Sequence, residues 1–363
     1  MLFARSLIGP ATAAGIGGLI IGLTKEEAPR CGPLDMVGIP TSERVSSLES
    51  RLNSLEVKAA VSTHAAFVFV KPHAAGSDAV VDLVKNGLNK AGIAIASEGE
   101  LSGATIDEQK LIDIHYGAIA SKATSVKPAA LNPPAKAKAA FEKAFGKSWQ
   151  AALDAGEVYN AMDACAKLGV DGDAMDGKWA TLNRGVNLIK FGGGFYCGQV
   201  DGIFVINGFY MAMRGKYTGA DAKIRFFTTE WDADKLSWED FRNKVLGGTD
   251  PKDAASGSLR KVVFTDWKKL GLAAEPDVGD NGVHASASPF EAMAERNNWC
   301  GQDIKTDVFG AGMLASGIPE ATIVDWSSDP QVEFEGKKQS LFDLLEDLNA
   351  RDCLEKAKKI AGL

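Results

Sequence analysis

The sequence has few of the residues that build disulfide frameworks, metal clusters or nucleic-acid surfaces. Its five cysteines are scattered over 363 residues without CxxC spacing, so we expect free thiols in a reducing compartment. A basic excess is also lacking, because the net charge is −7. This argues against a nucleic-acid partner, since no surplus positive charge is available to neutralise phosphates. A local pocket for a small phosphorylated ligand remains compatible with the composition.

Long uncharged stretches are rare, and the main example lies at the N-terminus. Residues 7–23 contain 17 uncharged positions rich in glycine and alanine, which is the short end of what can cross a bilayer. Arg5 without a nearby acid also fits a cleaved organelle presequence, and a segment buried against a partner is a third alternative. We therefore predict an anchor or targeting segment over residues 1–28. An organelle membrane follows as the expected location, with the mitochondrion preferred to the chloroplast.

Residues 29–62 are predicted to form a linker and a short coiled coil. An a/d seam with spacings of 3, 4 and 3 residues joins Val45, Leu48, Leu52 and Leu55. Within it, "RLNSLE" (Arg51 to Glu56) resembles the Arg-apolar-x-x-apolar-Glu pattern of short trimeric coiled coils. The alternative is a single helix lying on its own domain, because two heptads alone are marginal in water.

The next segment predicts the start of an α/β domain. Residues 66–70 form a short apolar run that ends at Lys71-Pro72, and Ser77 to Lys90 shows apolar positions at helical spacing before "AGIAIAS". A βαβ-like unit would place Lys71 at the C-terminal edge of its strand, where ligands of open sheets bind.

The remaining regions predict mostly helix. Residues 200–217 ("VDGIFVINGFYMAMRGKY") are strongly apolar and are interpreted as one buried helix. Near the C-terminus, a helix that packs on the domain or docks a neighbour is expected to carry Leu341, Phe342, Leu344, Leu345 and Leu348 on one side. "GVDGDAMDGKW" lacks the spacing of a calcium loop, so no metal site is predicted there.

One of only four histidines, His284, lies in "GDNGVHASASPFEAMAERNNW" between a glycine- and asparagine-rich turn and a predicted helix. An imidazole has an unperturbed pKa of about 6.5, so much of it is neutral and nucleophilic near pH 7. A nucleophile and a simple turn or helix cap are the two interpretations of this residue.

Together, "FVFVKPHAAG" and this late segment resemble the nucleoside diphosphate kinase family. That family has an early strand ending in Lys-Pro and an Asn-x-x-His-x-Ser-x-Ser segment followed by a glutamate on the next helix. Lys71 corresponds to the lysine at the strand end. The late-segment residues that fall at the family's spacing are Asn281, His284, Ser286, Ser288 and Glu295.

Two further motifs extend the resemblance to about a third of the chain. "IHYGAIA" resembles the family's His-Tyr pair and places Tyr116, whereas "VLGGTDPKDAASGSLR" places Thr249 and Arg260 eleven residues apart. The family's arginine six residues before the threonine falls on Asn243, with Arg242 one position away. A two-residue insertion lies just upstream, so we expect the loop to aim Arg242 into the same cleft. The aromatic residue that stacks on the base has no clear counterpart after Tyr116.

The resemblance implies an α/β sandwich, the ferredoxin-like nucleoside diphosphate kinase fold. Its four-stranded antiparallel sheet, with helices on one face, would occupy residues 63–301, interrupted by a helical insertion at 117–222. A helical extension would follow over residues 302–363. Assembly into dimers or trimers, including a homotrimer, is also implied, and a partner helix in the membrane is expected for the anchor.

The implied activity is phosphoryl transfer between nucleoside triphosphates and diphosphates through a phosphohistidine. His284 would be the nucleophile, and Glu295 would fix its tautomer. Mg²⁺ would arrive with the nucleotide, so no metal site on the protein is expected. The other histidines, His64, His73 and His115, are expected to be structural or solvated. The residues implied in nucleotide binding are Lys71, Tyr116, Arg242, Thr249, Arg260, Asn281 and Ser286.

The alternative is a weakly active or inactive kinase-like domain that serves as a structural subunit of a membrane complex. The displaced arginine, the missing stacking aromatic, the long insertions and the apolar N-terminus favour it, because a fold does not fix a function.

Overall fold

The computed structural model describes residues 41–363. The chain divides into two units, Met1–Ser47 and Leu48–Leu363. The predicted anchor or targeting segment at 1–28 lies outside the described residues. Within the described part, no helix combines the length and apolar character needed to cross a bilayer.

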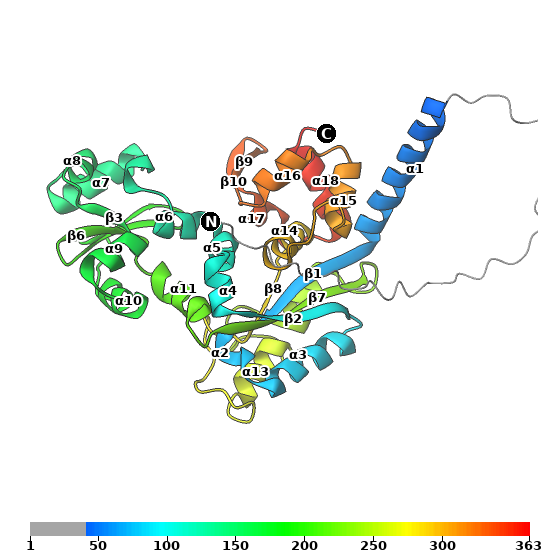
Figure 1. The fold of residues 1–363 in the computed structure, drawn as a ribbon, viewed down its shortest axis with the longest axis horizontal. Coiled ribbons are helices and arrows are strands. Elements are labelled where there is room, and N and C mark those ends of the chain that lie inside the picture. The colour runs from blue at the N-terminus through cyan, green and yellow to red at the C-terminus, as the bar shows by residue number, and fades with distance from the viewer. Residues whose placement is uncertain (1–40) are drawn as a thin grey trace, which may run out of the picture. The chain divides into compact units, whose positions relative to one another are not determined.

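Four strands form the central sheet, in the order β2-β7-β1-β8 with every neighbouring pair antiparallel (Figure 1). Helix α3 (Asp78–Lys90) joins the first two strands, and α13 (Leu259–Asp266) lies between the last two. This βαββαβ order is the split βαβ arrangement, and the four-stranded antiparallel sheet is as predicted. The strands are β1 (Thr63–Val70), β2 (Ala94–Ser102), β7 (Lys223–Asp232) and β8 (Val283–Ala285).

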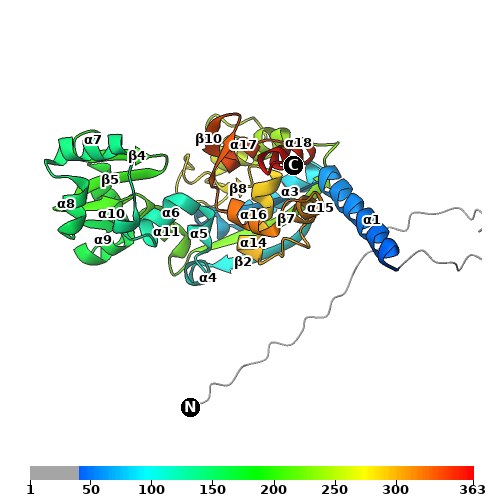
Figure 2. The ribbon, with the colours of Figure 1, turned by 90° about the horizontal axis from the view of Figure 1, so that it is seen from above.

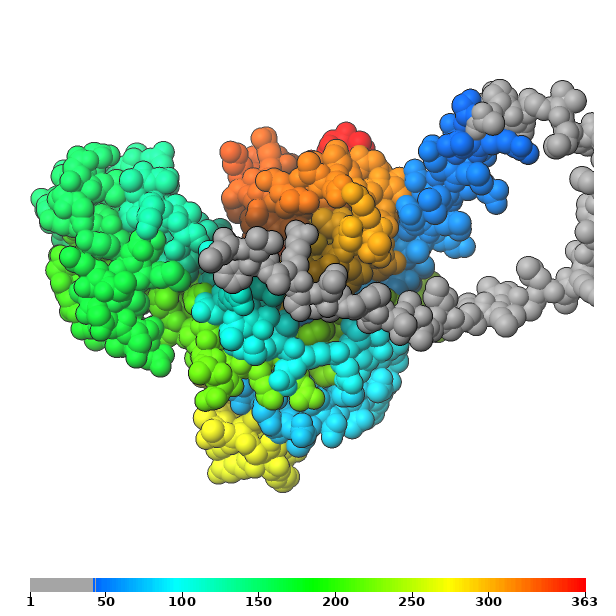
Figure 3. All heavy atoms as spheres, in the orientation of Figure 1, coloured from blue at the N-terminus to red at the C-terminus, as the bar shows by residue number. Residues whose placement is uncertain are grey.

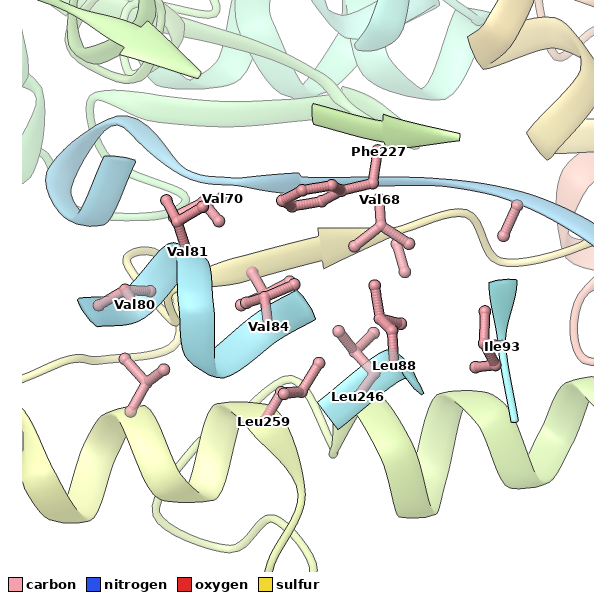
Figure 4. Close-up of a cluster of buried hydrophobic side chains, with 14 of the residues drawn as sticks. Val68, Val70, Val80, Val81, Val84, Leu88, Ile93, Phe227, Leu246 and Leu259 are labelled. Atoms are coloured by element: carbon pink, nitrogen blue, oxygen red, sulfur yellow. The ribbon is translucent and has the colours of Figure 1, made fainter. Parts of the chain in front are cut away.

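Helices cover both faces of this sheet, so the expectation of helices on one face is wrong. On one face, Val68 packs with Val84 of α3 and Leu259 of α13 (Figure 4). On the other face, Phe67 and Phe69 pack in a second cluster, which includes residues of α4 (Gly103–Glu108), α5 (Leu111–His115) and α14 (Pro289–Cys300). The reason is that β1 is apolar at nearly every position and would otherwise expose one of its faces.

Helix α14 is fixed at both ends by capping. The hydroxyl of Ser288 accepts a hydrogen bond from Glu291 N, and Pro289 occupies the first turn, where a missing N–H costs nothing. Gly301 ends the helix with a φ of 65°, which a glycine adopts without strain. These caps set the phase of the helix and thereby bury Glu295 toward the sheet.

The insertion at 117–222 contains a second sheet, so the prediction of a purely helical insertion is wrong. Four strands pair in the order β3-β6-β5-β4, and only β3 and β6 run parallel. They are β3 (Val158–Asn160), β4 (Leu188–Gly192), β5 (Phe195–Val200) and β6 (Ile203–Ile206). The helices of this region, drawn mostly in green in Figures 1 and 2, are α6 (Gly117–Thr124), α7 (Ala135–Phe145), α8 (Trp149–Asp154), α9 (Ala161–Leu168), α10 (Gly172–Ala180) and α11 (Tyr210–Thr218).

The prediction of a single buried helix over residues 200–217 is wrong for the first half of that range. The chain reverses at Asp201-Gly202, where both φ angles are positive, and this turn pairs β5 with β6. Only the second half is helical, as α11. A short apolar run cannot distinguish a buried strand from a buried helix by periodicity alone.

The C-terminal segment packs against α14 and is not entirely helical. It includes a two-stranded hairpin before the predicted leucine-rich helix, which stops at Leu345. Leu341, Leu344 and Leu345 are buried, as expected for a helix that packs on the domain. The elements, orange to red in Figure 3, are α15 (Val308–Ala315), α16 (Glu320–Trp326), β9 (Gln331–Phe334), β10 (Lys337–Ser340), α17 (Leu341–Leu345) and α18 (Ala350–Ile360).

The predicted coiled-coil segment is one helix, α1 (Thr41–Ser62). Leu48, Leu52 and Leu55 are 62%, 56% and 64% exposed. These three leucines therefore do not pack on the described part of the chain. The last turns of the helix do pack, because Ala60 is fully buried and lies against Gly312. The coiled coil itself stays a prediction.

His64 links the first strand to the last helix, and this contact predicts an acid sensitivity. Its buried Nε2 accepts a hydrogen bond of 3.0 Å from Ala350 N, and burial lowers the pKa of His64 to about 4. His64 is protonated near pH 6.5 in the unfolded chain but only near pH 4 in the folded one. The contribution of neutral His64 to the free energy of unfolding is therefore complete above pH 6.5 and falls as the pH drops toward 4.

We expect His64→Gln to cost about 1–2 kcal/mol at pH 7.5 and to flatten the loss of stability on acidification. Urea unfolding at pH 7.5 and pH 5 measures both effects. If the variant and the original chain lose the same stability between these two pH values, His64 is not the source of the acid sensitivity.

Candidate active site

His284 lies in the middle of β8 and not at a cap. Its backbone pairs with Phe69 of β1, and the two rings stack with centroids 4.6 Å apart and an interplanar angle of 25°. The turn before it is ordered by Asp277, whose Oδ1 accepts hydrogen bonds from Gly279 N and Asp280 N. Since Ser288 caps the following helix, the interpretation of His284 as a turn or helix cap is wrong.

Glu295 is the centre of a buried hydrogen-bond network. Its Oε1 lies 2.7 Å from His284 Nε2 and 3.1 Å from His115 Nδ1. Its Oε2 accepts a 2.5 Å hydrogen bond from Ser286 Oγ, which itself accepts one from Phe67 N on β1. One carboxylate therefore ties β8, β1, α5 and α14 together around His284.

The network holds the His284 ring neutral and oriented. Burial lowers the pKa of His284 to about 4, and Lys71 and His115 add to this effect although Glu295 opposes it. Burial alone would raise the pKa of Glu295, but the two histidines outweigh this effect and hold it below the ordinary value. With Nε2 donating its proton to the carboxylate, Nδ1 keeps the lone pair. Nδ1 forms no hydrogen bond with any described residue.

His115 is a site residue that sequence reasoning missed, because it was expected to be structural or solvated. Its ring lies 4.8 Å from that of His284 at an interplanar angle of 80°. The only available signal was its place beside Tyr116 in "IHYGAIA". Nothing in the local pattern shows that it meets a glutamate on a distant helix.

His115, His284 and Glu295 also form the one group within residues 41–363 whose ligand atoms could hold a metal ion, all lying within 4.8 Å of one another. The separations of 2.7 and 3.1 Å to the shared oxygen are hydrogen-bond lengths. The hydrogen-bonded triad therefore explains this group without a metal.

Lys71 and Arg260 bring positive charge to the same edge of the sheet. Lys71 directly follows β1, and its Nζ donates to Gly279 O at 2.9 Å. Burial, together with Arg260, lowers the pKa of Lys71 to about 8. Arg260 is buried on α13 and donates to Val283 O and Gly247 O at 2.9 and 3.0 Å, so it also positions β8. Its Nη2 makes no hydrogen bond within the described part of the chain.

Asn281 supplies an unpaired acceptor. Its side chain is 2% exposed and its Nδ2 donates to Thr249 O at 2.9 Å, whereas its Oδ1 is buried without a partner among the described residues. Asn281 thus ties Thr249 to the histidine segment through the backbone of Thr249, whose side chain is exposed. A buried acceptor without a donor points to a ligand or water that would satisfy it.

Arg242 forms ion pairs with two carboxylates of the C-terminal segment. Its Nη1 lies 2.6 Å from Glu346 Oε1 and 2.7 Å from Asp347 Oδ1, both in the chain after α17. It lies in a π-helical turn, Phe241–Leu246, that follows α12 (Trp238–Asp240). A π-turn accommodates one extra residue, which fits the one-residue offset of Arg242. Burial, followed by the positive charge of Arg242, lowers the pKa of Arg260 to about 10. The expectation that Arg242 faces the phosphates stays a prediction.

Tyr116 and Glu291 complete the surroundings. Tyr116 packs edge-on against His115 with ring centroids 5.0 Å apart, and burial raises its pKa. A cavity of about 140 Å³ is lined by Tyr116, Glu291, His115 and Glu295. Glu291, which the sequence did not single out, is partly buried there, and burial followed by the charge of Glu295 raises its pKa to about 8.

Comparisons with known proteins leave the family open. No family model and no curated protein matches the chain. Among 17 solved chains that match, one is an NDP kinase from Pyrobaculum aerophilum, with 17% identity and a TM-score of 0.31 over 65% of this chain and 95% of the other. These values are too low to assign a family or an activity.

Proposed function

We propose that this chain transfers the γ-phosphoryl group of a nucleoside triphosphate to a nucleoside diphosphate through a phosphohistidine at His284. The observation that carries the proposal is the hydrogen bond of 2.7 Å between His284 Nε2 and Glu295 Oε1. It leaves Nδ1 of a neutral ring with its lone pair available, and the half-buried Lys71 and the buried Arg260 add positive charge to the site.

The transfer has two balanced steps. Nδ1 attacks the γ-phosphorus, an N–P bond forms, and the bond to the bridging oxygen breaks as the nucleoside diphosphate leaves with the electron pair. A terminal oxygen of a second nucleoside diphosphate then attacks the phosphohistidine and returns the electron pair to Nδ1. Covalent catalysis of this kind replaces one difficult transfer by two easier ones. Glu295 accepts the hydrogen bond that His284 Nε2–H donates, and its negative charge stabilises the positive charge that develops on the ring.

The remaining residues serve binding and charge neutralisation. Phosphoryl transfer needs in-line placement and positive charge near the non-bridging oxygens, and Lys71 and the free Nη2 of Arg260 offer this charge. Mg²⁺ enters as part of the substrate, bound to the nucleotide phosphates. The unpaired Oδ1 of Asn281 suits a hydroxyl donor such as a nucleotide sugar. Tyr116 and Thr249 are proposed to border the nucleotide. Ser286 is fully buried and is proposed to act through its hydrogen bond to Glu295.

A direct test is an exchange assay with ATP and GDP. The purified full chain is expected to produce GTP and ADP, measured by chromatography. His284→Ala, purified in the same way, is the control for a contaminating kinase from the expression host. GTP formed equally by both preparations, or by neither, would contradict the proposal.

The ion pairs of Arg242 predict a restraint on phosphate binding. The double variant Glu346→Gln/Asp347→Asn removes both carboxylate charges near Arg242 Nη1 and should free it for the nucleotide. We expect KM for the triphosphate to fall several-fold with kcat nearly unchanged, because binding strengthens equally in ground and transition states. Lys244→Gln, which removes an exposed ion pair of the same turn with Asp240, is the matched control. An unchanged KM would show that Arg242 does not reach the phosphates.

The structural-subunit alternative is supported by one observation. Arg242, the candidate phosphate ligand with the weakest motif match, is held by two carboxylates of the C-terminal segment. A setting at an organelle membrane belongs to both proposals and rests on residues 1–28.

A further inference from the structure

The exposed apolar stripe of α1 has no partner within the described residues. Leu48, Leu52 and Leu55 are each more than half exposed, and Val45 is 51% exposed one turn earlier on the same continuous helix (Figure 1). Scattered exposed apolar residues need no explanation, but a seam at a and d positions does. The stripe ends where the helix joins its domain, because Ala60 is buried against Gly312.

The charges that flank the stripe are self-complementary, as pairing with a second copy of this chain requires. With Leu52 at position a and Leu55 at position d, Arg51 occupies position g and Glu56 position e. In a parallel, in-register coiled coil, a g residue faces the e residue five positions later on the neighbouring helix. Arg51 would thus meet Glu56 of another copy, and the sequence repeats this pairing one heptad earlier with Arg44 and Glu49.

The same charges exclude the opposite orientation. An antiparallel pair brings g against g and e against e, which would place arginine beside arginine and glutamate beside glutamate. The spacing of five residues also does not serve the helix itself, because side chains pair within one helix at three or four residues. Neither Arg51 nor Glu56 forms an ion pair with any side chain that the structure describes.

We propose that α1 joins copies of this chain in a parallel, in-register coiled coil. Two heptads are marginal alone, so we expect a weak, concentration-dependent association. This inference is independent of the phosphoryl-transfer proposal, because its readout is molar mass.

The test is sedimentation velocity of the full chain, followed by seam variants. The original chain is expected to have a molar mass that is a multiple of 38.4 kDa. Leu52→Glu should raise the dissociation constant about 100-fold and Arg51→Glu about tenfold. Since both side chains are exposed, neither change should lower the thermal midpoint of the domain. Ser50→Glu adds the same charge at an exposed f position and should leave the mass unchanged.

The double variant Arg51→Glu/Glu56→Arg decides the orientation. It exchanges the charges and restores every g-to-e pair of a parallel bundle, so association should return to within a few-fold of the original. A monomeric original chain, or an oligomer that Leu52→Glu does not weaken, would overturn the coiled coil. Failure of the double variant to recover association would overturn the parallel register.

Discussion

Replacing His284 by alanine is expected to lower the rate of phosphoryl transfer by a factor on the order of 10³ or more while the protein stays folded. The variant removes the only nitrogen that is proposed to bond to phosphorus. The fold should tolerate the change, because Glu295 keeps its contacts with His115 and Ser286. Exchange kinetics with ATP and GDP measure the loss.

His64→Gln is the matched control for this experiment. It removes another buried histidine of the same sheet, one that contacts Ala350 and not Glu295. It should lose stability but keep exchange activity at 25 °C. A His284→Ala preparation with the activity of the original chain would refute the assignment of the nucleophile.

Replacing Glu295 by glutamine is expected to reduce both catalysis and stability. The amide replaces one acceptor oxygen by an NH2 donor, so the hydrogen bond that Ser286 Oγ donates to the carboxylate is lost. The negative charge that stabilises a positively charged His284 ring is lost as well. We expect kcat to fall about 10²-fold or more, with a smaller change in KM. The free energy of unfolding should fall by about 2–4 kcal/mol, because a buried network is left incomplete.

Glu291→Gln is the control that distinguishes the loss of Glu295 from the loss of another acid on α14. Glu291 lies one turn earlier, and its raised pKa favours the neutral form, which resembles an amide. Its substitution should change unfolding and kcat far less. Equal kcat values for the Glu295→Gln variant and the original chain would show that Glu295 does not position His284.

The parts of the site that could be predicted depend on short-range spacing. Lys71 follows a buried strand directly, and His284 and Glu295 lie on adjacent elements, so their sequence separation places them together. The strand that contains Val68 and the helix that contains Val84 could be predicted for the same reason, because their apolar patterns are local. Both are positions where the pattern and the packing require the same conformation.

The parts that could not be predicted depend on contacts between distant segments. His115 meets Glu295 only because α5 and α14 cover the same face of the sheet, and no local pattern encodes that contact. The ion pairs of Arg242 with Glu346 and Asp347 have the same origin. The strands of the insertion were missed because Phe195–Val200 and Ile203–Ile206 are mostly apolar without regular alternation.

The central claim is the covalent phosphohistidine, and labelling tests it most directly. The purified full chain is incubated with γ-labelled ATP and Mg²⁺, then treated separately with acid and with base. We predict a label on the protein that is lost in acid, kept in base, absent from His284→Ala and discharged by added nucleoside diphosphate. A protein that takes up no label, or one whose label survives acid, would contradict transfer through His284.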